Sequence, residues 1–223
     1  MTGTGVAGNA DDARAFGVDE AGKGPVLGSM FAAAVVGDPD GLPDGVADSK
    51  RLSAARREEL DAAIRAACEV GVAEVPVARI DDPATDMNAL TVEAQASALD
   101  AVAADGLAGH VDAGDVDEAR FGRRVADAVA ADVDVTAAHG ADDEYALVAA
   151  ASVVAKVARD SHVDALADEY GDVGSGYPGD PTTREFLREY VREHGALPEC
   201  ARASWQTSAD ALAAAEQAGL EEF

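Results

Sequence analysis

Short apolar runs near the start of the chain are separated by glycine, proline and aspartate. Residues 16–19 form the first run, and the Gly/Pro segment 22–25 must end it. Residues 29–36 form the second run, which the turn-rich segment 37–45 closes. This pattern predicts two strands joined by a glycine-rich turn.

Helical periodicity dominates the rest of the chain. Ser53, Thr91 and Thr182 can each cap a helix, and these helices would end near residues 68, 104 and 194. The pattern predicts further helices over residues 116–129, 145–170 and 208–218, and further strands over residues 70–78, 109–113 and 132–137. We therefore expect an α/β fold, in which helices flank a mixed sheet and form a C-terminal extension.

The length of 223 residues allows one substantial core. We expect a disordered segment at 1–14, the main domain at 15–172, a helical extension at 173–216 and a separate tail at 217–223. The longest apolar runs, which start at Phe31 and Tyr145, are shorter than the roughly 20 residues that a membrane span needs. The first residues lack the pattern of a signal peptide, so we expect a cytoplasmic location. We also expect a monomer that has no membrane partner.

Acidic residues outnumber basic residues by 43 to 17, which gives a formal net charge of −26 and an isoelectric point near 4.2. A nucleic-acid-binding protein is normally basic. A disordered acidic chain and a cation buffer are the alternatives, but 48% hydrophobic residues in periodic segments argue against disorder. A folded acidic surface is typical of proteins from cells that accumulate molar salt, where a Debye length of about 3 Å screens the surface carboxylates from one another.

Asp19 and Glu20 are adjacent carboxylates at the end of the first predicted strand, immediately before the glycine-rich turn. Neighbouring side chains on a strand point to opposite faces, so only a twist or a bulge would bring both to one metal site. An exposed acidic pair is the alternative, and such pairs are common in a chain this acidic. The residues around the pair therefore decide between the two interpretations.

The string GVDEAGKGPVLG at residues 17–28 closely resembles the N-terminal signature of ribonuclease HII, the type 2 RNase H family. Further matching strings follow in the same order: DSKRL at 48–52, HVDAGD at 110–115, HGADD at 139–143, ASVVAKVARD at 151–160 and GSGYP at 174–178. The resemblance extends from residue 16 to residue 205 and is greatest to archaeal members. It implies an RNase H-like α/β fold.

By this resemblance, the catalytic carboxylates and metal ligands are Asp19, Glu20, Asp112 and Asp142. Hydrolysis of a phosphodiester by two hard cations, held roughly 3.5 to 4 Å apart, requires such a cluster. Ligands that are all oxygen favour Mg²⁺ or Mn²⁺ over zinc. Asp143 is the alternative to its neighbour Asp142.

The family recognises the ribose 2′-hydroxyl through a glycine-rich loop, which matches Gly22-Lys23-Gly24 in this chain. The usual arginine of this loop is a lysine here, which keeps the charge but loses a planar contact. Tyr177 would stack beside the ribonucleotide, and its alternative role is packing against Pro178. The resemblance implies phosphate contacts for Lys50, Ser152, Lys156 and Arg159.

Lysine is rare, and all three lysines, Lys23, Lys50 and Lys156, lie inside the matching strings. This placement independently supports the interpretation that a lysine side chain is required at these positions. The alternative is that the three lysines fall inside the strings by chance. Gly140 is a further departure from the family pattern, because archaeal relatives often carry lysine there. The departure removes one basic contact near Asp142.

The resemblance implies an endonuclease that acts on RNA–DNA hybrids and on DNA containing ribonucleotides. It would cut on the 5′ side of the ribonucleotide and leave 5′-phosphate and 3′-hydroxyl ends. Another two-metal nuclease of the RNase H fold is the alternative enzyme. The alternative from another class is a module that binds hybrids through Lys50, Lys156 and Tyr177 without cutting them.

Residues 217–223 spell Q-x-x-L-x-x-F, with Gln217, Leu220 and Phe223 at the fixed positions. This pattern resembles the peptide by which replication enzymes dock on the sliding clamp. Leu220 and Phe223 would share one face of a helical turn, with Gln217 on the same side. The second aromatic residue of the usual motif is missing, so packing against the chain's own domain is the alternative.

We expect the free energy of unfolding to rise with KCl, because salt screens the repulsion among the 43 acidic residues. Urea midpoints measured from roughly 0.1 M to roughly 1 M KCl check this, since the Debye length falls from about 10 to about 3 Å over that range. Urea is suitable because it is uncharged. Midpoints that fall steadily with added KCl would contradict the halophilic interpretation.

Overall fold

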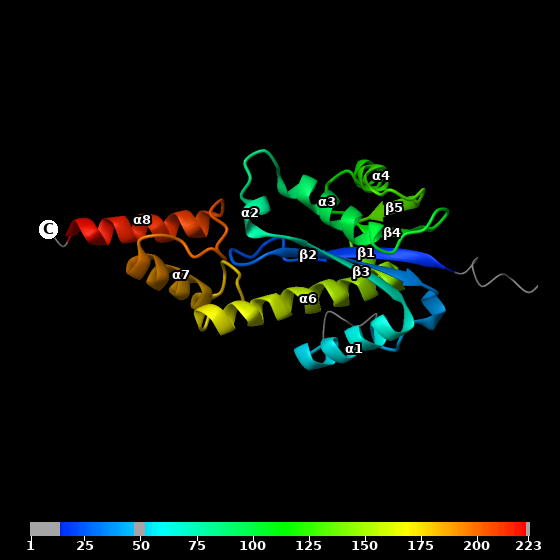
Figure 1. Cartoon of the computed structure of the whole chain (residues 1–223), viewed down its shortest axis with the longest axis horizontal. Coiled ribbons are helices and arrows are strands. Elements are labelled where there is room, and N and C mark those ends of the chain that lie inside the picture. Colours follow the sequence, from blue (N-terminus) through cyan, green and yellow to red (C-terminus); the bar gives the residue numbers. More distant parts are fainter. Residues whose placement is uncertain (1–13, 47–51, 222–223) are drawn as a thin grey trace, which may run out of the picture.

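The computed structural model describes residues 14–46 and 52–221, without the side chains of 218–221 (Figure 1). Most of the segment expected to be disordered, residues 1–14, lies outside the described residues. The same is true of Lys50 and of the side chains of Leu220 and Phe223. The expectations for these positions therefore stay predictions.

A five-stranded mixed sheet forms the centre of the structure, in the order β3-β2-β1-β4-β5. The strands β1 (Ala15–Ala21), β2 (Met30–Gly37) and β3 (Glu69–Val75) are antiparallel neighbours. The strands β4 (Ala108–Asp112) and β5 (Asp134–Ala138) continue the sheet in parallel with β1. The central strand β1 therefore joins both halves of the sheet, and its C-terminal end lies beside that of β4.

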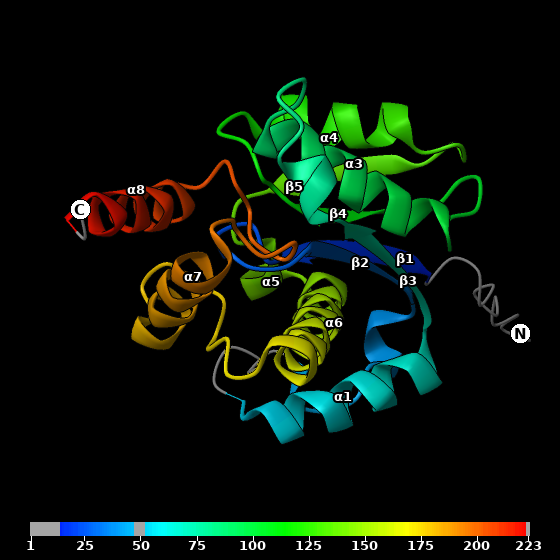
Figure 2. The same ribbon diagram turned by 60° about the vertical axis from the view of Figure 1, so that its left-hand side comes forward.

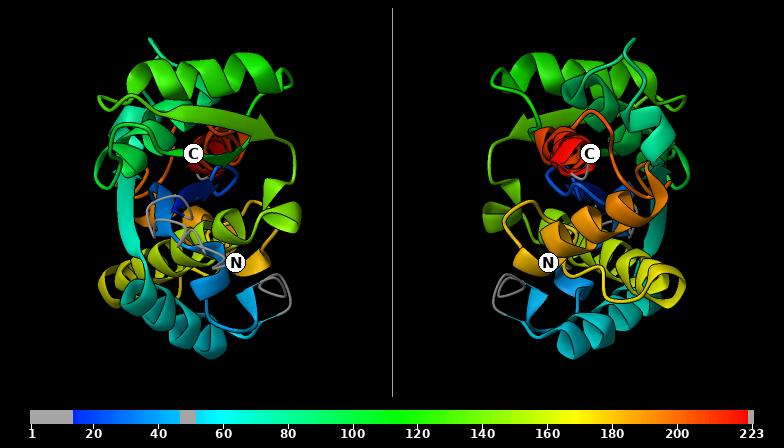
Figure 3. Two further views of the ribbon diagram at one scale, coloured as in Figure 1. Left: turned by 90° about the vertical axis from the view of Figure 1, so that its right-hand side faces the viewer. Right: turned by 90° about the vertical axis from the view of Figure 1, so that its left-hand side faces the viewer.

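Helices cover both faces of the sheet (Figure 2). The helices α3 (Met87–Asp100) and α4 (Glu118–Ala128) lie on one face, while α1 (Ala54–Ala67) and α6 (Ala146–Tyr170) lie on the other. The end-on views of Figure 3 show α4 at the top and α1 at the bottom, with strands between them. The fold is thus the expected α/β arrangement of a mixed sheet between helical layers.

Both faces of β2 are buried. One face contributes Met30, Ala32, Ala34 and Val36 to the core shared with α3 and α4. The other face contributes Ala33 and Val35 to the core shared with α1 and α6. A strand covered on both sides needs no polar positions, which explains the uninterrupted apolar run in the sequence.

The helices α7 (Pro181–His194) and α8 (Gln206–Glu221) lie together at one end of the molecule (Figure 1). They share a third core with the loop after β1 and with the later part of α6, through residues such as Leu27, Leu166 and Leu187. The expected C-terminal helices are therefore present. Among the described residues, no helix is both long and apolar enough to span a membrane.

Two of the three expected capping residues are wrong, whereas Ser53 caps α1 as expected. Asp86 caps α3 instead of Thr91, because its carboxylate accepts a hydrogen bond from Ala89 N at 2.8 Å. Asp180 caps α7 instead of Thr182. The first turn of α3 already carries core residues, Met87 and Leu90, so the periodicity locates the helix, but it does not fix the residue that caps it.

Three short helical segments are not among the predicted elements. The 3₁₀ helix η1 (Pro39–Gly41) lies in the turn-rich segment, and α2 (Val77–Ile80) replaces the end of the strand expected at 70–78. The helix α5 (Ala141–Glu144) begins after Gly140, whose φ of 64° is in the left-handed region that glycine adopts readily. Segments this short contain too little periodicity to be recognised from sequence.

The helix α6 can lie directly against β1 because Gly17 has no side chain. A Cβ atom at Gly17 would overlap the backbone of α6 at Leu147 and Val148. The early part of α6 is rich in alanine, which also permits a close approach. This contact brings α6 to the end of β1 that contains Asp19.

We expect Gly17→Ala to lower the free energy of unfolding by about 1 to 3 kcal/mol or more, because the backbone of α6 would have to move away from β1. Gly41→Ala is a matched control, since a Cβ atom there would meet nothing closer than 3.9 Å. Urea unfolding measures both variants. A Gly17→Ala variant as stable as the parent would show that α6 does not need this close contact.

Candidate active site

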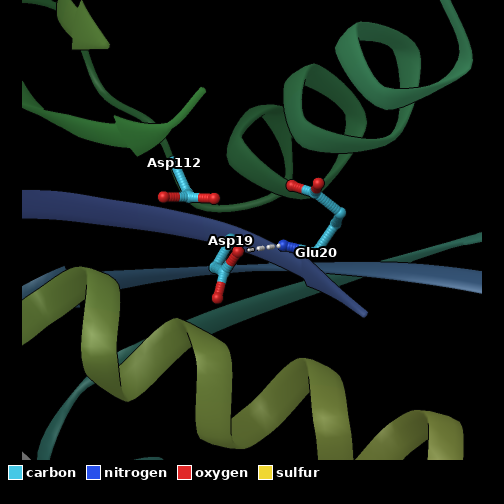
Figure 4. A group of neighbouring side chains, drawn as sticks. All are labelled: Asp19, Glu20 and Asp112. Carbon is cyan, nitrogen blue, oxygen red and sulfur yellow. Dashed lines mark hydrogen bonds between the residues drawn. The ribbon is translucent and has the colours of Figure 1, made fainter. Parts of the chain in front are cut away.

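Three carboxylates meet at the end of the sheet where β1 and β4 lie side by side (Figure 4). Asp19 and Glu20 are near the end of β1, and Asp112 is the last residue of β4. Val18 pairs with Val111 in the parallel register, which places Asp19 beside Asp112. One carboxylate oxygen from each of the three residues lies within 4.8 Å of the other two. Such a group of oxygens suits a divalent metal ion.

Asp19 and Glu20 reach this group from opposite faces of β1. Figure 4 shows the side chain of Asp19 on the side of α6 and that of Glu20 on the side of α3. The pairing of β1 with β2 is unbroken from Ala15 to Ala21, so it contains no bulge. A bulge is therefore not needed to bring both carboxylates to one site.

Asp19 and Asp112 are each held by hydrogen bonds. Asp19 accepts one from the backbone N of Glu20 at 2.7 Å and another from the hydroxyl of Ser152 on α6. Asp112 accepts one from the backbone N of Ala141, at the start of α5, at 2.9 Å. The orientation of the two aspartates therefore depends on helices from a later part of the chain.

Gln95 of α3 is a contact that the sequence patterns do not single out. Its fully buried side chain donates from Nε2 to Glu20 Oε2 at 2.6 Å and to the carbonyl oxygen of Asp112 at 2.9 Å. Its Oε1 has no hydrogen-bond partner among the described residues. The available signal was a long polar side chain at a position of the helix whose neighbours on the same face are mostly apolar, because buried polar groups need partners.

Burial raises the pKa of all three carboxyl groups. For Asp19 the pKa rises well above its usual value, first through burial and then through the negative charge of Glu20. Lys23 opposes the rise for Glu20, because its Nζ lies 3.4 Å from Glu20 Oε1. A bound divalent cation would favour the ionised form of every member of the group.

Asp142 lies beside this group without belonging to it. Its charge contributes to the raised pKa of Asp112, so the two carboxylates are near each other. Among the described residues, however, the mutually close ligand atoms come from Asp19, Glu20 and Asp112. Asp142 and Asp143 each make further contacts. The choice between them as a fourth ligand stays a prediction.

A cleft of about 630 Å³ opens next to Glu20. Its wall contains the glycine-rich loop, four cationic side chains and one aromatic ring, contributed by Gly22, Lys23, Gly24, Arg57, Lys156, Arg159 and Tyr177. Four cations around one cleft are a strong local concentration in a chain with a net charge of −26. This lining is suited to an anionic ligand with an exposed phosphate backbone.

Two of the cleft arginines are held in place by Asp160. Arg57 Nη2 and Arg159 Nη1 donate to its two carboxylate oxygens at 2.9 and 3.1 Å. The guanidinium carbon of Arg159 lies 4.9 Å from the centre of the Tyr177 ring. Since 43% of Tyr177 is exposed, the ring is accessible from solvent in spite of this contact.

Ser152 lies behind the cleft wall and is fully buried. Lys156 Nζ donates to its hydroxyl oxygen at 2.7 Å, and the hydroxyl is also hydrogen-bonded to Asp19. Ser152 therefore links a cation of the cleft to a carboxylate of the metal group. The expected contact with phosphate would require its buried hydroxyl to become accessible.

Arg57 is another cleft residue that lies outside the matching strings. It belongs to α1, whose other arginines, Arg56 and Arg65, form ion pairs with acidic residues of the same helix. Nothing in the local sequence distinguishes Arg57 from these two. Only the packing of α1 against α6 brings it to the cleft.

Comparisons with known proteins agree with this geometry. Residues 16–208 match the family model of ribonuclease HII. The ribonuclease HII of Halobacterium salinarum is 78% identical over 209 residues, which cover 93% of this chain and 99% of that protein.

Two solved structures have the same fold. The crystal structure of ribonuclease H2 from Pyrococcus horikoshii has a TM-score of 0.86 and 35% identity, over 92% of this chain and 99% of that chain. The ribonuclease HII from Archaeoglobus fulgidus, solved as a complex with PCNA, has a TM-score of 0.79 and 39% identity, over 86% of this chain and 94% of that chain. The chain therefore belongs to the ribonuclease HII family, together with members from halophilic archaea.

Proposed function

We propose that this chain hydrolyses the RNA strand of RNA–DNA hybrids and cuts on the 5′ side of ribonucleotides in duplex DNA. The observation that carries the proposal is the group formed by Asp19, Glu20 and Asp112 beside a cationic cleft. Membership of the ribonuclease HII family supports the reaction class. The expected products have 5′-phosphate and 3′-hydroxyl ends.

The carboxylate group would hold two divalent ions, Mg²⁺ or Mn²⁺, because its donor atoms are all oxygen. Two such ions supply a nucleophilic water and stabilise the leaving oxygen. Asp142 is the proposed fourth ligand. Gln95 and Ser152 would keep the ligands oriented through their hydrogen bonds to Glu20 and Asp19.

Phosphates of the substrate would bind along the cationic wall of the cleft. Asp160 orients Arg57 and Arg159, and Ser152 orients Lys156, so these cations are partly pre-positioned. Pre-positioned cations lose less side-chain freedom when they bind an anion. Lys50 is proposed for the same role on the sequence resemblance.

The ribonucleotide would bind between the glycine-rich loop and Tyr177. A Cβ atom at Gly24 would lie 3.6 Å from Cε1 of the Tyr177 ring, so the loop and the ring are close neighbours. Bare backbone at Gly22 and Gly24 permits a close approach to the 2′-hydroxyl. The exposed ring of Tyr177 offers a surface for stacking.

A complete site can be built from one chain, since all carboxylates and cleft cations come from the same molecule. We therefore propose a monomer as the active form. The substrates are nucleic acids of the chromosome, so the proposed location is the cytoplasm.

We also propose that Gln217, Leu220 and Phe223 dock on a sliding clamp. The helix α8 ends at one extremity of the molecule, and Gln217 on it is exposed (Figure 1). A partner could therefore reach the tail without approaching the cleft. The Archaeoglobus fulgidus relative was solved in complex with PCNA, which supports this kind of partner.

Asp19→Asn should lower the cleavage rate of a duplex with one ribonucleotide by more than about 100-fold, because it removes a proposed metal ligand. Gln95→Met should lower the rate by about 10- to 100-fold, because it removes the hydrogen bond that orients the ligand Glu20. Gel assays with Mg²⁺ and with Mn²⁺ measure both rates. Asp134→Asn, at an exposed position of β5, is the control and should keep the parent rate.

Asp19→Asn should also raise the urea midpoint of the metal-free protein at neutral pH. The folded-state pKa of Asp19 is raised, so its stabilising contribution is present at low pH and is lost as the pH rises through that pKa. Full activity in folded Asp19→Asn would contradict the assigned site. A parent that binds the duplex in Mg²⁺ without cutting it would instead indicate a binding module.

Deletion of residues 220–223 should abolish binding to the sliding clamp of the same organism and leave cleavage of a short duplex unchanged. Clamp binding is measured with the clamp immobilised on a surface, and duplex cleavage is measured by the gel assay. Gln217→Ala is a milder variant that should weaken clamp binding. Clamp affinity that survives the deletion, or loss of folding, would refute the docking role of the tail.

A further inference from the structure

Arg202, in the segment between α7 and α8, is the largest fully buried side chain among the described residues. It lies outside the strings that match the family signature, and it does not line the cleft. A buried guanidinium group is costly unless its N–H groups find acceptors. Its contacts therefore reveal what this residue does.

The guanidinium group of Arg202 donates to three backbone carbonyl groups around the glycine-rich loop. Nη2 donates to Gly22 O at 2.7 Å, Nη1 to Lys23 O at 3.0 Å, and Nε to Gly28 O at 2.8 Å. Only the planar fork of arginine can bind acceptors in this fan-like arrangement, because lysine offers a single nitrogen. Arg202 thus supports the loop from behind.

Trp205 binds the next carbonyl group of the loop, that of Gly24. Its Nε1 donates to Gly24 O at 3.2 Å, and its ring lies under the Arg202 guanidinium, whose central carbon is 4.9 Å from the ring centre. The carbonyl groups of Gly22, Lys23 and Gly24 are therefore all bound from the side of the C-terminal segment.

These contacts determine where the loop amides point. In a planar trans peptide the C=O and the following N–H point in opposite directions. Since the carbonyls of Gly22 and Lys23 face Arg202, the N–H groups of Lys23 and Gly24 face away from it. Neither N–H donates to an acceptor among the described residues, and both residues line the cleft.

Burial lowers the pKa of Arg202 to about 10, so the guanidinium group stays protonated at neutral pH. All of its donors therefore remain available to the loop. The nearby charge of Asp81 raises the pKa and supports the protonated form.

We propose that Arg202 and Trp205 are positioning residues for ribose recognition, which hold the loop so that the amides of Lys23 and Gly24 can donate to the 2′-oxygen of a ribonucleotide. This inference rests on the proposed function, which places the ribonucleotide at this loop. Loosening the support should weaken the preference for ribose over deoxyribose more than it weakens binding to nucleic acid in general.

The test compares Arg202→Lys and Trp205→Phe with the parent in the full chain. Binding is measured for a DNA duplex with one ribonucleotide and for the same duplex made of DNA alone, with Ca²⁺ replacing Mg²⁺ to prevent cleavage. The preference is the Kd for the all-DNA duplex divided by the Kd for the duplex with the ribonucleotide. We expect this ratio of Kd values to fall roughly tenfold for Arg202→Lys and roughly threefold for Trp205→Phe. Affinity for the all-DNA duplex should change little.

Ser208→Ala is the matched control. The buried hydroxyl of Ser208 donates to the carbonyl oxygen of Arg202 at 2.8 Å, so the variant disturbs the same segment without removing a contact to the loop. Its urea midpoint should fall while the ratio of Kd values stays at the parent value. An equal loss of preference in Ser208→Ala would overturn the proposal, because it would show a general effect of stability.

An unchanged ratio in folded Arg202→Lys and Trp205→Phe would also overturn it. If Arg202→Lys does not fold, Trp205→Phe decides the question, since it removes one N–H and keeps an aromatic ring. A parent that shows no preference for the ribonucleotide and no cleavage with Mg²⁺ would refute the proposed function itself. A parent that shows both, with unchanged variants, would refute only the positioning role.

Discussion

The crowding of three carboxylates, one buried and two partly buried, is the constraint on which the arrangement of the site depends. The pKa values of Asp19, Glu20 and Asp112 are raised first by burial, and in each case the charge of a neighbouring carboxylate adds to the rise. Contacts from both helical layers hold them together, through Gln95 on one face of the sheet and Ser152 on the other. The sheet and its two layers therefore serve to keep an unfavourable group assembled until a cation binds.

The distribution of charge over the chain is uneven. The chain carries a net charge of −26, yet Lys23, Arg57, Lys156 and Arg159 surround one cleft. In molar salt the Debye length is about 3 Å, so long-range attraction of a nucleic acid is weak and only direct contacts remain effective. In the proposed function, the oriented cations, the exposed ring of Tyr177 and the backbone of the glycine-rich loop would be contacts of this kind.

The segment between α7 and α8 contacts the loop of the cleft although it does not line the cleft. The hydrogen bond from Arg202 to Gly22 joins residues 180 positions apart in the sequence. Through it, the packing of α7 and α8 supports a loop that begins at the end of the central strand. Two parts of the chain that are far apart in sequence thus determine the conformation of this loop together.

Periodicity in the sequence determined the α/β class and most elements, because it records local conformation. The three carboxylates that the structure brings together were identified through the resemblance of short strings to a known family. The sequence did not determine Asp86 as a cap, since both Asp86 and Thr91 are residues that can cap a helix and the choice depends on where the first turn begins. Only the tertiary structure decided that Gln95, Arg57 and Arg202 reach the site. Their roles arise from contacts between distant segments, and no local pattern of residues encodes such contacts.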